Sequence, residues 1–137
     1  EGYGTYMAQV VEVSVTGGKL AVHRITCAVD CGQMVNPNIV DQQVEGSILF
    51  GLTAALWGEI MLARGQVQQR NFDRYRLLRL PEVPRIDVHL LDSTEAPGGI
   101  GEPGTAVVGP ALANAIFAAT GKRLRALPVA RQGIVTA

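Results

Sequence analysis

Residues 6–29, YMAQVVEVSVTGGKLAVHRITCAV, contain two apolar runs that flank a pair of glycines. The runs Tyr6–Val15 and Leu20–Val29 are rich in β-branched residues and partly alternate between apolar and polar positions. The intervening Thr16-Gly17-Gly18-Lys19 supplies flexible turn residues. Because β-branched runs joined by a glycine turn are typical of paired strands, residues 6–29 are predicted to form a β-hairpin.

A long helix is predicted after this hairpin. Asn36 can cap the first free amides of a helix, and Pro37 suits its first position. A series of apolar residues spaced four apart then marks one side of the helix: Val40, Val44, Ile48, Leu52, Leu56 and Ile60. This spacing is helical, so we expect a helix from about Pro37 to about Gly58.

A strand and a second helix are predicted in the C-terminal half. Residues Arg85–Leu91 alternate well enough for a strand. The second helix is expected from about Thr105 to about Thr120, with Pro110 near its start and Gly121 in the left-handed position after its end. The sequence therefore predicts one α+β domain over residues 1–137. In it, two helices pack on one face of an antiparallel or mixed sheet that contains both N-terminal strands.

Composition excludes several classes of protein. The 137 residues are 47% hydrophobic with zero formal net charge. No apolar run approaches the roughly 20 residues that a membrane-spanning helix needs. Four basic residues follow the last acidic one, but without interleaved aromatic residues they favour a solvated face or a subunit contact over nucleic-acid binding. The sequence opens without a methionine, so we expect an excised segment and assign no compartment.

The two cysteines, Cys27 and Cys31, lie four residues apart in CAVDC. A structural zinc site normally takes four protein ligands, and nothing in the sequence places His23 or His89 near this pair. A disulfide between the two is possible, but the sequence does not argue for one. We expect two structural thiols, and we assign no metal-ligating residue in this chain.

The loop Gly98-Gly99-Ile100-Gly101-Glu102-Pro103-Gly104 carries the most functional information. Its glycines match the G-x-G-x-x-G spacing of a dinucleotide fold. However, such a fingerprint should directly follow a strand and precede an acidic residue by about 20 positions. Here a proline-containing loop precedes the glycines, and no acidic residue follows Glu102. The dinucleotide interpretation is therefore rejected.

Two interpretations of Glu102 remain open. In the structural one, the glycines make a tight turn and the carboxylate of Glu102 caps the following helix, where it would add a few tenths to about 1 kcal/mol. In the functional one, the glycines let a bulky ligand approach the backbone closely. Glu102 would then act as a general base, since its neighbours are apolar or lack side chains. The sequence does not decide between these alternatives.

The same residues resemble a known family. The G-x-G-E-P-G loop, followed by PALANAIFAATGKRLRALPV, is similar to the end of the molybdopterin-binding domain of the molybdenum hydroxylases, the family of xanthine oxidase and aldehyde oxidoreductase. Upstream, AVDCGQMVNPNIVDQQVEGSILFGL resembles the family segment with its N-P and Q-x-E-G elements. The resemblance covers about Gly4 to Val129, and the large subunit it matches best is the isoquinoline 1-oxidoreductase beta type.

This resemblance implies a site and a chemistry. It implies a molybdenum–pterin cofactor, as molybdopterin or its cytosine dinucleotide, whose pterin holds the metal. It assigns Glu102 as the base that takes a proton from the metal's hydroxyl ligand, and Gln43 as a hydrogen-bond partner of the molybdenum site. Gly46, Gly99 and Gly101 are expected to let the cofactor approach. Glu45 is expected to be a structural charge.

The resemblance also sets the expected partners. Large subunits of this family are several times longer, so this chain would be the C-terminal portion of one and would receive most cofactor contacts from elsewhere. It would work with the remainder of the large subunit, an iron–sulfur small subunit and an aldehyde or N-heterocycle substrate, which is hydroxylated with oxygen from water. The alternative is a non-catalytic assembly module that keeps the fold.

Overall fold

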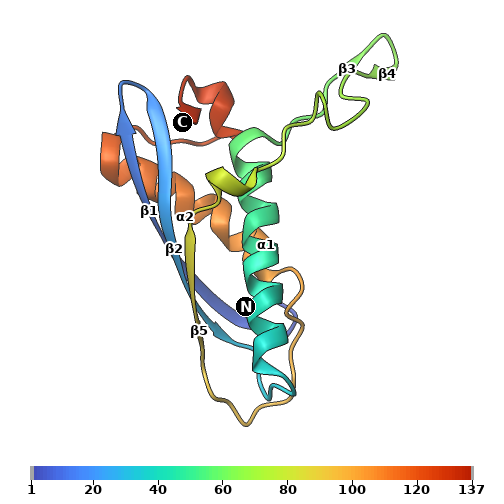
Figure 1. Cartoon of the computed structure of the whole chain (residues 1–137), viewed down its shortest axis with the longest axis vertical. Coiled ribbons are helices and arrows are strands. Elements are labelled where there is room, and N and C mark those ends of the chain that lie inside the picture. The colour runs from blue at the N-terminus through green and yellow to red at the C-terminus, as the bar shows by residue number, and fades with distance from the viewer. Residues whose placement is uncertain (1, 137) are drawn as a thin grey trace.

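The computed structural model describes residues 2–136, and its layers are visible in Figure 1. The helices and strands follow in the order β1 (Tyr6–Thr16), β2 (Lys19–Asp30), α1 (Pro37–Trp57), β3 (Leu62–Ala63), β4 (Gln66–Val67), β5 (Arg85–Leu90), α2 (Pro103–Thr120) and β6 (Val135–Thr136). Short 3₁₀ helices, Leu80–Glu82 and Val129–Gln132, lie in the connections. The predicted α+β class is confirmed.

The N-terminal hairpin forms as predicted. β1 and β2 pair antiparallel from Tyr6↔Asp30 to Thr16↔Lys19, with a bulge after Glu12. Gly17 and Gly18 both have positive φ angles, 59° and 78°, which side chains disfavour, so this tight turn requires glycine.

The sheet is mixed because a helix connects its second and third long strands. β5 lies parallel to β2, in the register Arg24↔Arg85 to Val29↔Leu90. Parallel neighbours need a long crossover connection, and α1 lies within that connection. The long strands are ordered β1-β2-β5, and β6 extends the same side of β2 at Lys19 and Leu20.

Helix α1 begins where its sequence predicts. The side chain of Asn36 accepts a hydrogen bond from the Ile39 amide, and Pro37 occupies the first turn. The buried members of the predicted apolar series are Val44, Ile48, Leu52 and Leu56. Ile60 was wrongly included, because the helix ends at Trp57 and the Ile60 side chain is exposed.

Helix α2 is longer at its start than predicted. It begins at Pro103, so Pro110 lies in its interior and not near its start. Proline lacks a backbone N–H, and an N–H at the first helical position would have no partner within the helix. Pro103 occupies that position. Gly121 ends the helix with a φ of 73°, as predicted.

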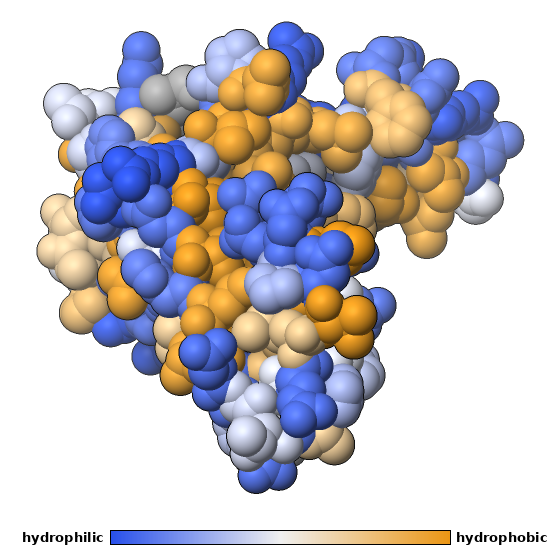
Figure 2. Space-filling view, turned by 60° about the horizontal axis from the view of Figure 1, so that its bottom comes forward, coloured by the Kyte–Doolittle hydropathy of each residue, from blue (hydrophilic) through white to orange (hydrophobic). Residues whose placement is uncertain are grey.

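Both helices pack on one face of the sheet and share a single core with it. Ile25, Cys27 and Val29 of β2 meet Ile48 of α1 and Leu112 of α2 in that core. Neither helix in residues 2–136 combines the length and apolar character needed to cross a bilayer. Figure 2 shows that apolar side chains are nonetheless exposed across the middle of one face of the molecule.

The two cysteines are free thiols, and both are buried in the core. This agrees with the expectation of structural cysteines. Burial raises the pKa of the Cys27 thiol to about 11, while a side-chain hydrogen bond with Gln9 acts in the opposite direction. Burial also raises the pKa of Cys31.

The segment between α1 and β5 projects away from the body as an arm (Figure 1). Its tip is the small β3–β4 hairpin, whose turn residues Arg64 and Gly65 both have positive φ angles. The returning leg is fixed to α1 by Arg76, whose guanidinium lies 4.0 Å from the centre of the Trp57 ring and pairs with Glu82 at 2.6 Å.

Candidate active site

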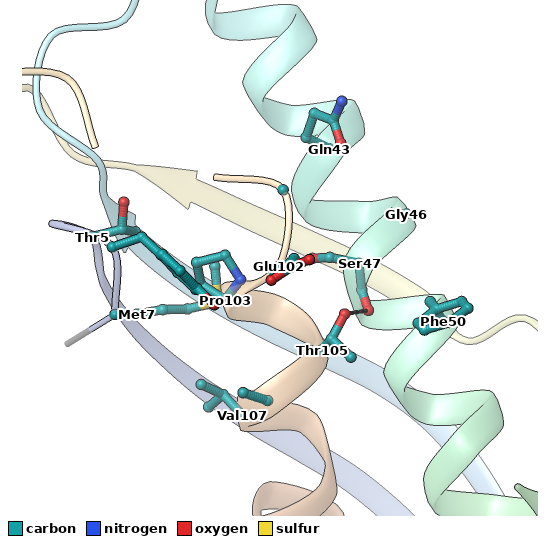
Figure 3. Close-up of a pocket in the computed structure, with 14 residues that line it drawn as sticks. Thr5, Met7, Gln43, Gly46, Ser47, Phe50, Glu102, Pro103, Thr105 and Val107 are labelled. Atoms are coloured by element: carbon teal, nitrogen blue, oxygen red, sulfur yellow. Dashed lines mark hydrogen bonds between the residues drawn. The ribbon is translucent and has the colours of Figure 1, made fainter. Parts of the chain in front are cut away.

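A cavity of about 550 Å³ opens where α1, the start of α2 and the residues before β1 meet (Figure 3). This volume is within the range of small-molecule and cofactor pockets. Its walls comprise Gly2, Tyr3, Thr5, Met7, Gln43, Gly46, Ser47, Phe50, Gly101, Glu102, Pro103, Thr105, Ala106 and Val107. The segments with the G-E-P and Q-x-E-G elements, far apart in sequence, therefore form one site.

Glu102 provides the only charged side chain among the described residues that line this cavity. It occupies the residue before α2, and its backbone carbonyl accepts a hydrogen bond from the Thr105 amide at 2.9 Å. Its side chain makes no capping hydrogen bond and is exposed to the cavity. Glu102 therefore occupies the N-cap position, as in the structural interpretation, but its carboxylate makes no capping hydrogen bond and lines the cavity.

The position of Glu102 is fixed by close contact between the two helices. The hydroxyl of Thr105 donates a hydrogen bond to the carbonyl of Ser47 at 3.0 Å, the dashed line in Figure 3. A side chain at Gly104 would collide with the hydroxyl of Ser47, and one at Gly51 would lie 2.6 Å from the carbonyl oxygen of Thr105. These glycines allow the start of α2 to approach the middle of α1.

Gln43 lies on α1 at the upper end of the cavity, as labelled in Figure 3. Gly46 and Ser47 follow it on the same side of the helix, which confirms the predicted grouping. The Gln43 side chain is exposed, and no hydrogen bond holds it within residues 2–136. Its amide is thus available to a ligand. Glu45 lies outside the cavity lining.

The open glycines of this region are Gly46 and Gly101. A methyl group on either would meet no atom within 4 Å, and neither has a positive φ angle. Both line the cavity, so packing within residues 2–136 and backbone geometry leave their lack of a side chain unexplained. A group approaching the backbone from the cavity would explain it.

Gly99 was expected at this site, but it lies outside the cavity lining. A methyl group there would lie 3.0 Å from the Tyr3 side chain, and its amide donates to the Tyr3 carbonyl at 2.8 Å. Its carbonyl accepts a hydrogen bond from the Thr5 hydroxyl, also at 2.8 Å. Gly99 therefore fastens the loop to the N-terminal segment, a contact between residues too distant in sequence to predict.

Phe50 is a site residue that the sequence interpretation missed. Its ring is 72% exposed and lines the cavity on the same helix as Gln43. The signal was present, since Phe50 follows Gln43 by seven residues, two helical turns, and so shares its side of α1. Tyr3, Thr5 and Met7 also line the cavity, and no motif indicated them.

The cavity does not contain a cluster of metal-binding side chains among the described residues. In the part of the chain that the structure describes, no three His, Cys, Asp or Glu side chains form a group that could hold a metal ion. His23 instead shares a hydrogen bond with Ser14 at 2.8 Å. The cavity thus offers a carboxylate, an amide and two open glycines.

Comparison with known proteins relates this arrangement to established ones. Residues 2–84 match the family model described as "Molybdopterin cofactor-binding domain". The chain is 43% identical over 119 residues to a membrane-bound aldehyde dehydrogenase of Gluconacetobacter polyoxogenes, whose name specifies pyrroloquinoline quinone. It is also 43% identical over 110 residues to the beta subunit of isoquinoline 1-oxidoreductase from Brevundimonas diminuta. These alignments cover 87% and 80% of this chain, but only 15% and 14% of the relatives.

The solved structures agree with the sequence comparison. The aldehyde oxidoreductase of Desulfovibrio desulfuricans superposes with a TM-score of 0.76 at 25% identity, covering 90% of this chain and 14% of that one. The α+β fold, its cavity and the family match define a cofactor-binding domain with an acidic residue at the cavity. More specifically, the chain belongs to the molybdopterin cofactor-binding domains of the molybdenum hydroxylases, whose cofactor is a molybdenum–pterin.

Proposed function

We propose that this chain forms the general-base side of the active site of a molybdenum hydroxylase large subunit. The reaction would hydroxylate a carbon of an aldehyde or an N-heterocycle with oxygen drawn from water. The observation that carries the proposal is the free, exposed carboxylate of Glu102 at the cavity, within a family that binds a molybdenum–pterin. The family model matches residues 2–84 and does not include Glu102. The support for Glu102 as the base therefore comes from the geometry of the cavity and not from that match.

The geometry of the cavity supports cofactor binding at this place. Gly46 and Gly101 leave their parts of the wall open, and a methyl group at either would project where no protein atom lies within 4 Å. When bound, the cofactor supplies a two-electron oxidant and a Lewis acid that acidifies water. Gly46 and Gly101 would allow its close approach, and the amide of Gln43 would hydrogen-bond to it. Most other contacts would come from regions outside this chain.

Glu102 would accept the proton of the water-derived nucleophile. A carboxylate suffices for this task because the metal has already made the proton acidic. The contact between α1 and α2 holds the Glu102 backbone, so the carboxylate moves only about its own side-chain bonds. Such restriction favours a productive geometry between base and nucleophile.

The partners follow from the same proposal. The remainder of the large subunit would complete the cavity, and an iron–sulfur small subunit would accept the electrons. Two relatives, of isoquinoline 1-oxidoreductase and of nicotinate dehydrogenase, are each named as one subunit of an enzyme, which supports a multi-subunit assembly. Because another relative's name specifies pyrroloquinoline quinone, molybdenum and quinone should both be quantified in the purified complete enzyme. Stoichiometric quinone without molybdenum would contradict the proposed chemistry.

The decisive experiment compares Glu102→Gln with Gln43→Ala in the complete enzyme at matched molybdenum content. The amide of Glu102→Gln is nearly isosteric but cannot accept the proton. Single-turnover reduction by substrate should therefore slow by about 10² to 10⁴. Gln43→Ala should slow this reduction less, because it removes one hydrogen bond to the cofactor, worth about 1 to 3 kcal/mol. If substrate reduces the molybdenum centre of the Glu102→Gln enzyme at a rate within about threefold of the parent rate, Glu102 is not the base.

The alternative of an assembly module predicts a different outcome. In that case Glu102→Gln would leave turnover of the assembled enzyme unchanged, and the site would take no part in chemistry. The free carboxylate and the two open glycines favour the enzyme, because packing in this chain requires none of them.

A further inference from the structure

Strand β5 is paired along one edge only. It pairs with β2 from Arg85 to Leu90, and no strand within residues 2–136 lies on its other side. In a parallel strand, backbone N–H and C=O groups point alternately to the two sides, so this edge carries unpaired hydrogen-bonding groups. Residues 85–90, RIDVHL, include no proline or lysine, two common devices against strand addition, and their charged residues Arg85 and Asp87 pair with each other.

The core beneath this edge is incompletely covered. On β2, Ile25, Cys27 and Val29 face the helices and are at most 1% exposed. Their neighbours on β5, which face the same way, are only half-buried: Ile86, Val88 and Leu90. Burial is thus less complete on β5 than on β2. An added strand would remove this apolar surface from water.

A groove with unbalanced charge runs along the same edge. Its volume is about 490 Å³, and its walls include Asp41 and Glu45 from α1 and Arg85, Asp87 and His89 from β5. Asp87 is balanced by Arg85 at 2.8 Å and by Arg24 at 3.5 Å. Across residues 2–136, neither Asp41 nor Glu45 has an ion pair or a side-chain hydrogen bond. The α1 wall therefore carries two unpaired negative charges.

We propose that the free edge of β5 is completed by an extended strand that bears basic side chains facing Asp41 and Glu45. This strand would come from a part of the large subunit outside these 137 residues, so the inference rests on the proposed membership in a longer subunit. The curated relatives are long enough to supply it, since this chain spans 15% and 14% of two of them. Backbone pairing would give affinity, and charge would select the strand.

A second copy of this chain fits the edge less well. Symmetric pairing of two β5 edges would place the two α1 helices side by side over the junction. Asp41 and Glu45 of one copy would then face the same residues of the other, and like charges so placed repel. A strand with basic side chains would instead be attracted by Asp41 and Glu45.

Hydrogen–deuterium exchange tests the proposal in the 137-residue chain and in the complete subunit. Alternate amides of residues 85–90 should exchange about 100-fold more slowly in the complete subunit, because they become hydrogen-bonded there. The amides of residues 25–29, paired in the chain itself, serve as the internal standard for folding. Equal protection of residues 85–90 in both proteins would overturn the proposal.

A charge variant tests the identity of the strand within the complete subunit alone. Asp41→Lys with Glu45→Lys should lower protection of residues 85–90 about 10-fold, whereas the exposed pair Asp73→Lys with Glu95→Lys, neither of which lines the groove, should not. Unchanged protection in the first variant would refute a basic strand. If the isolated chain dimerises and its β5 amides become protected as concentration rises, a second copy is the partner and the proposal is wrong. None of these readouts depends on Glu102 or on turnover.

Discussion

The hydroxyl of Thr105 donates a hydrogen bond to the carbonyl of Ser47 across 3.0 Å, and so ties the first turn of α2 to the middle of α1. These residues are 58 positions apart in sequence. Ser47 follows Gln43 by one helical turn, and Thr105 follows Glu102 by three residues. The bond therefore links α1, which carries the amide, to α2, which the carboxylate of Glu102 directly precedes.

Thr105→Val should weaken this link without changing the shape of the side chain. The free energy of unfolding of the 137-residue chain should fall by about 0.5 to 1.5 kcal/mol, the typical contribution of one such hydrogen bond. Urea unfolding followed by circular dichroism measures this change. Thr105→Ser keeps the hydroxyl and is the matched control. An unfolding free energy that is unchanged in Thr105→Val but lower in Thr105→Ser would show that the methyl group matters and the hydrogen bond does not.

The local elements of this fold were predictable, because each has a short-range cause. The glycine turn after Thr16 and the Asn36 cap lie within a few residues of the elements that they define. The start of α2 was placed near Thr105 because Pro103 was included in the preceding loop, whereas it is the first residue of the helix.

Long-range contacts explain what the sequence could not show in the candidate site. Gln43, Gly46, Gly101 and Glu102 meet at one cavity, but nothing local indicates that Gly99 faces Tyr3 instead. The parallel pairing of β5 with β2 likewise depends on how α1 crosses the sheet. Motifs thus indicated which residues to consider, and packing determined which of them reach the cavity.

The glycines at the helix contact should contribute to the stability of the fold. Gly104→Ala would place a methyl group against the Ser47 hydroxyl, and Gly51→Ala would place one 2.6 Å from the Thr105 carbonyl oxygen. Overpacking of this kind typically costs about 1 to 3 kcal/mol. Thermal unfolding of the 137-residue chain should show a lower midpoint for both. Wild-type midpoints in both variants would mean that the helices separate easily, and Glu102 would then be less firmly placed.

Gly46→Ala should have opposite effects on stability and on cofactor binding. The methyl group meets no protein atom, and alanine favours a helix interior over glycine by about 0.8 to 1 kcal/mol. The isolated chain should therefore become more stable in urea. In the complete enzyme the same methyl group would enter the cavity, so the molybdenum content after purification should fall. Full cofactor loading would show that the wall at Gly46 stays clear of the cofactor.

The isolated 137-residue chain should not retain molybdenum. Most contacts to the pterin are expected from outside this chain, so its share of the site would bind too weakly to survive purification. Elemental analysis of the purified chain should find far less than one molybdenum per chain. A stoichiometric amount would show that these residues build the cofactor site by themselves, and the division of the site proposed above would be wrong.

The buried Cys27 should make stability depend on pH in the alkaline range. Burial raises its pKa from the ordinary 9.0 to about 11, so the folded protein holds this proton more tightly than the unfolded chain. Its contribution to stability is complete below pH 9 and is lost as the pH rises toward 11. The two-unit difference corresponds to about 3 kcal/mol.

Cys27→Ala isolates this contribution from the other groups that titrate in the alkaline range. Urea unfolding of both proteins should be measured between about pH 8 and about pH 11.5, and the difference between their unfolding free energies plotted against pH. That difference should shrink by about 3 kcal/mol across the range, because only the parent loses the protonated thiol. Cys31, whose pKa is also raised by burial, is present in both proteins and cancels to a first approximation. A difference that stays constant with pH would show that the pKa of Cys27 is not raised in the folded protein.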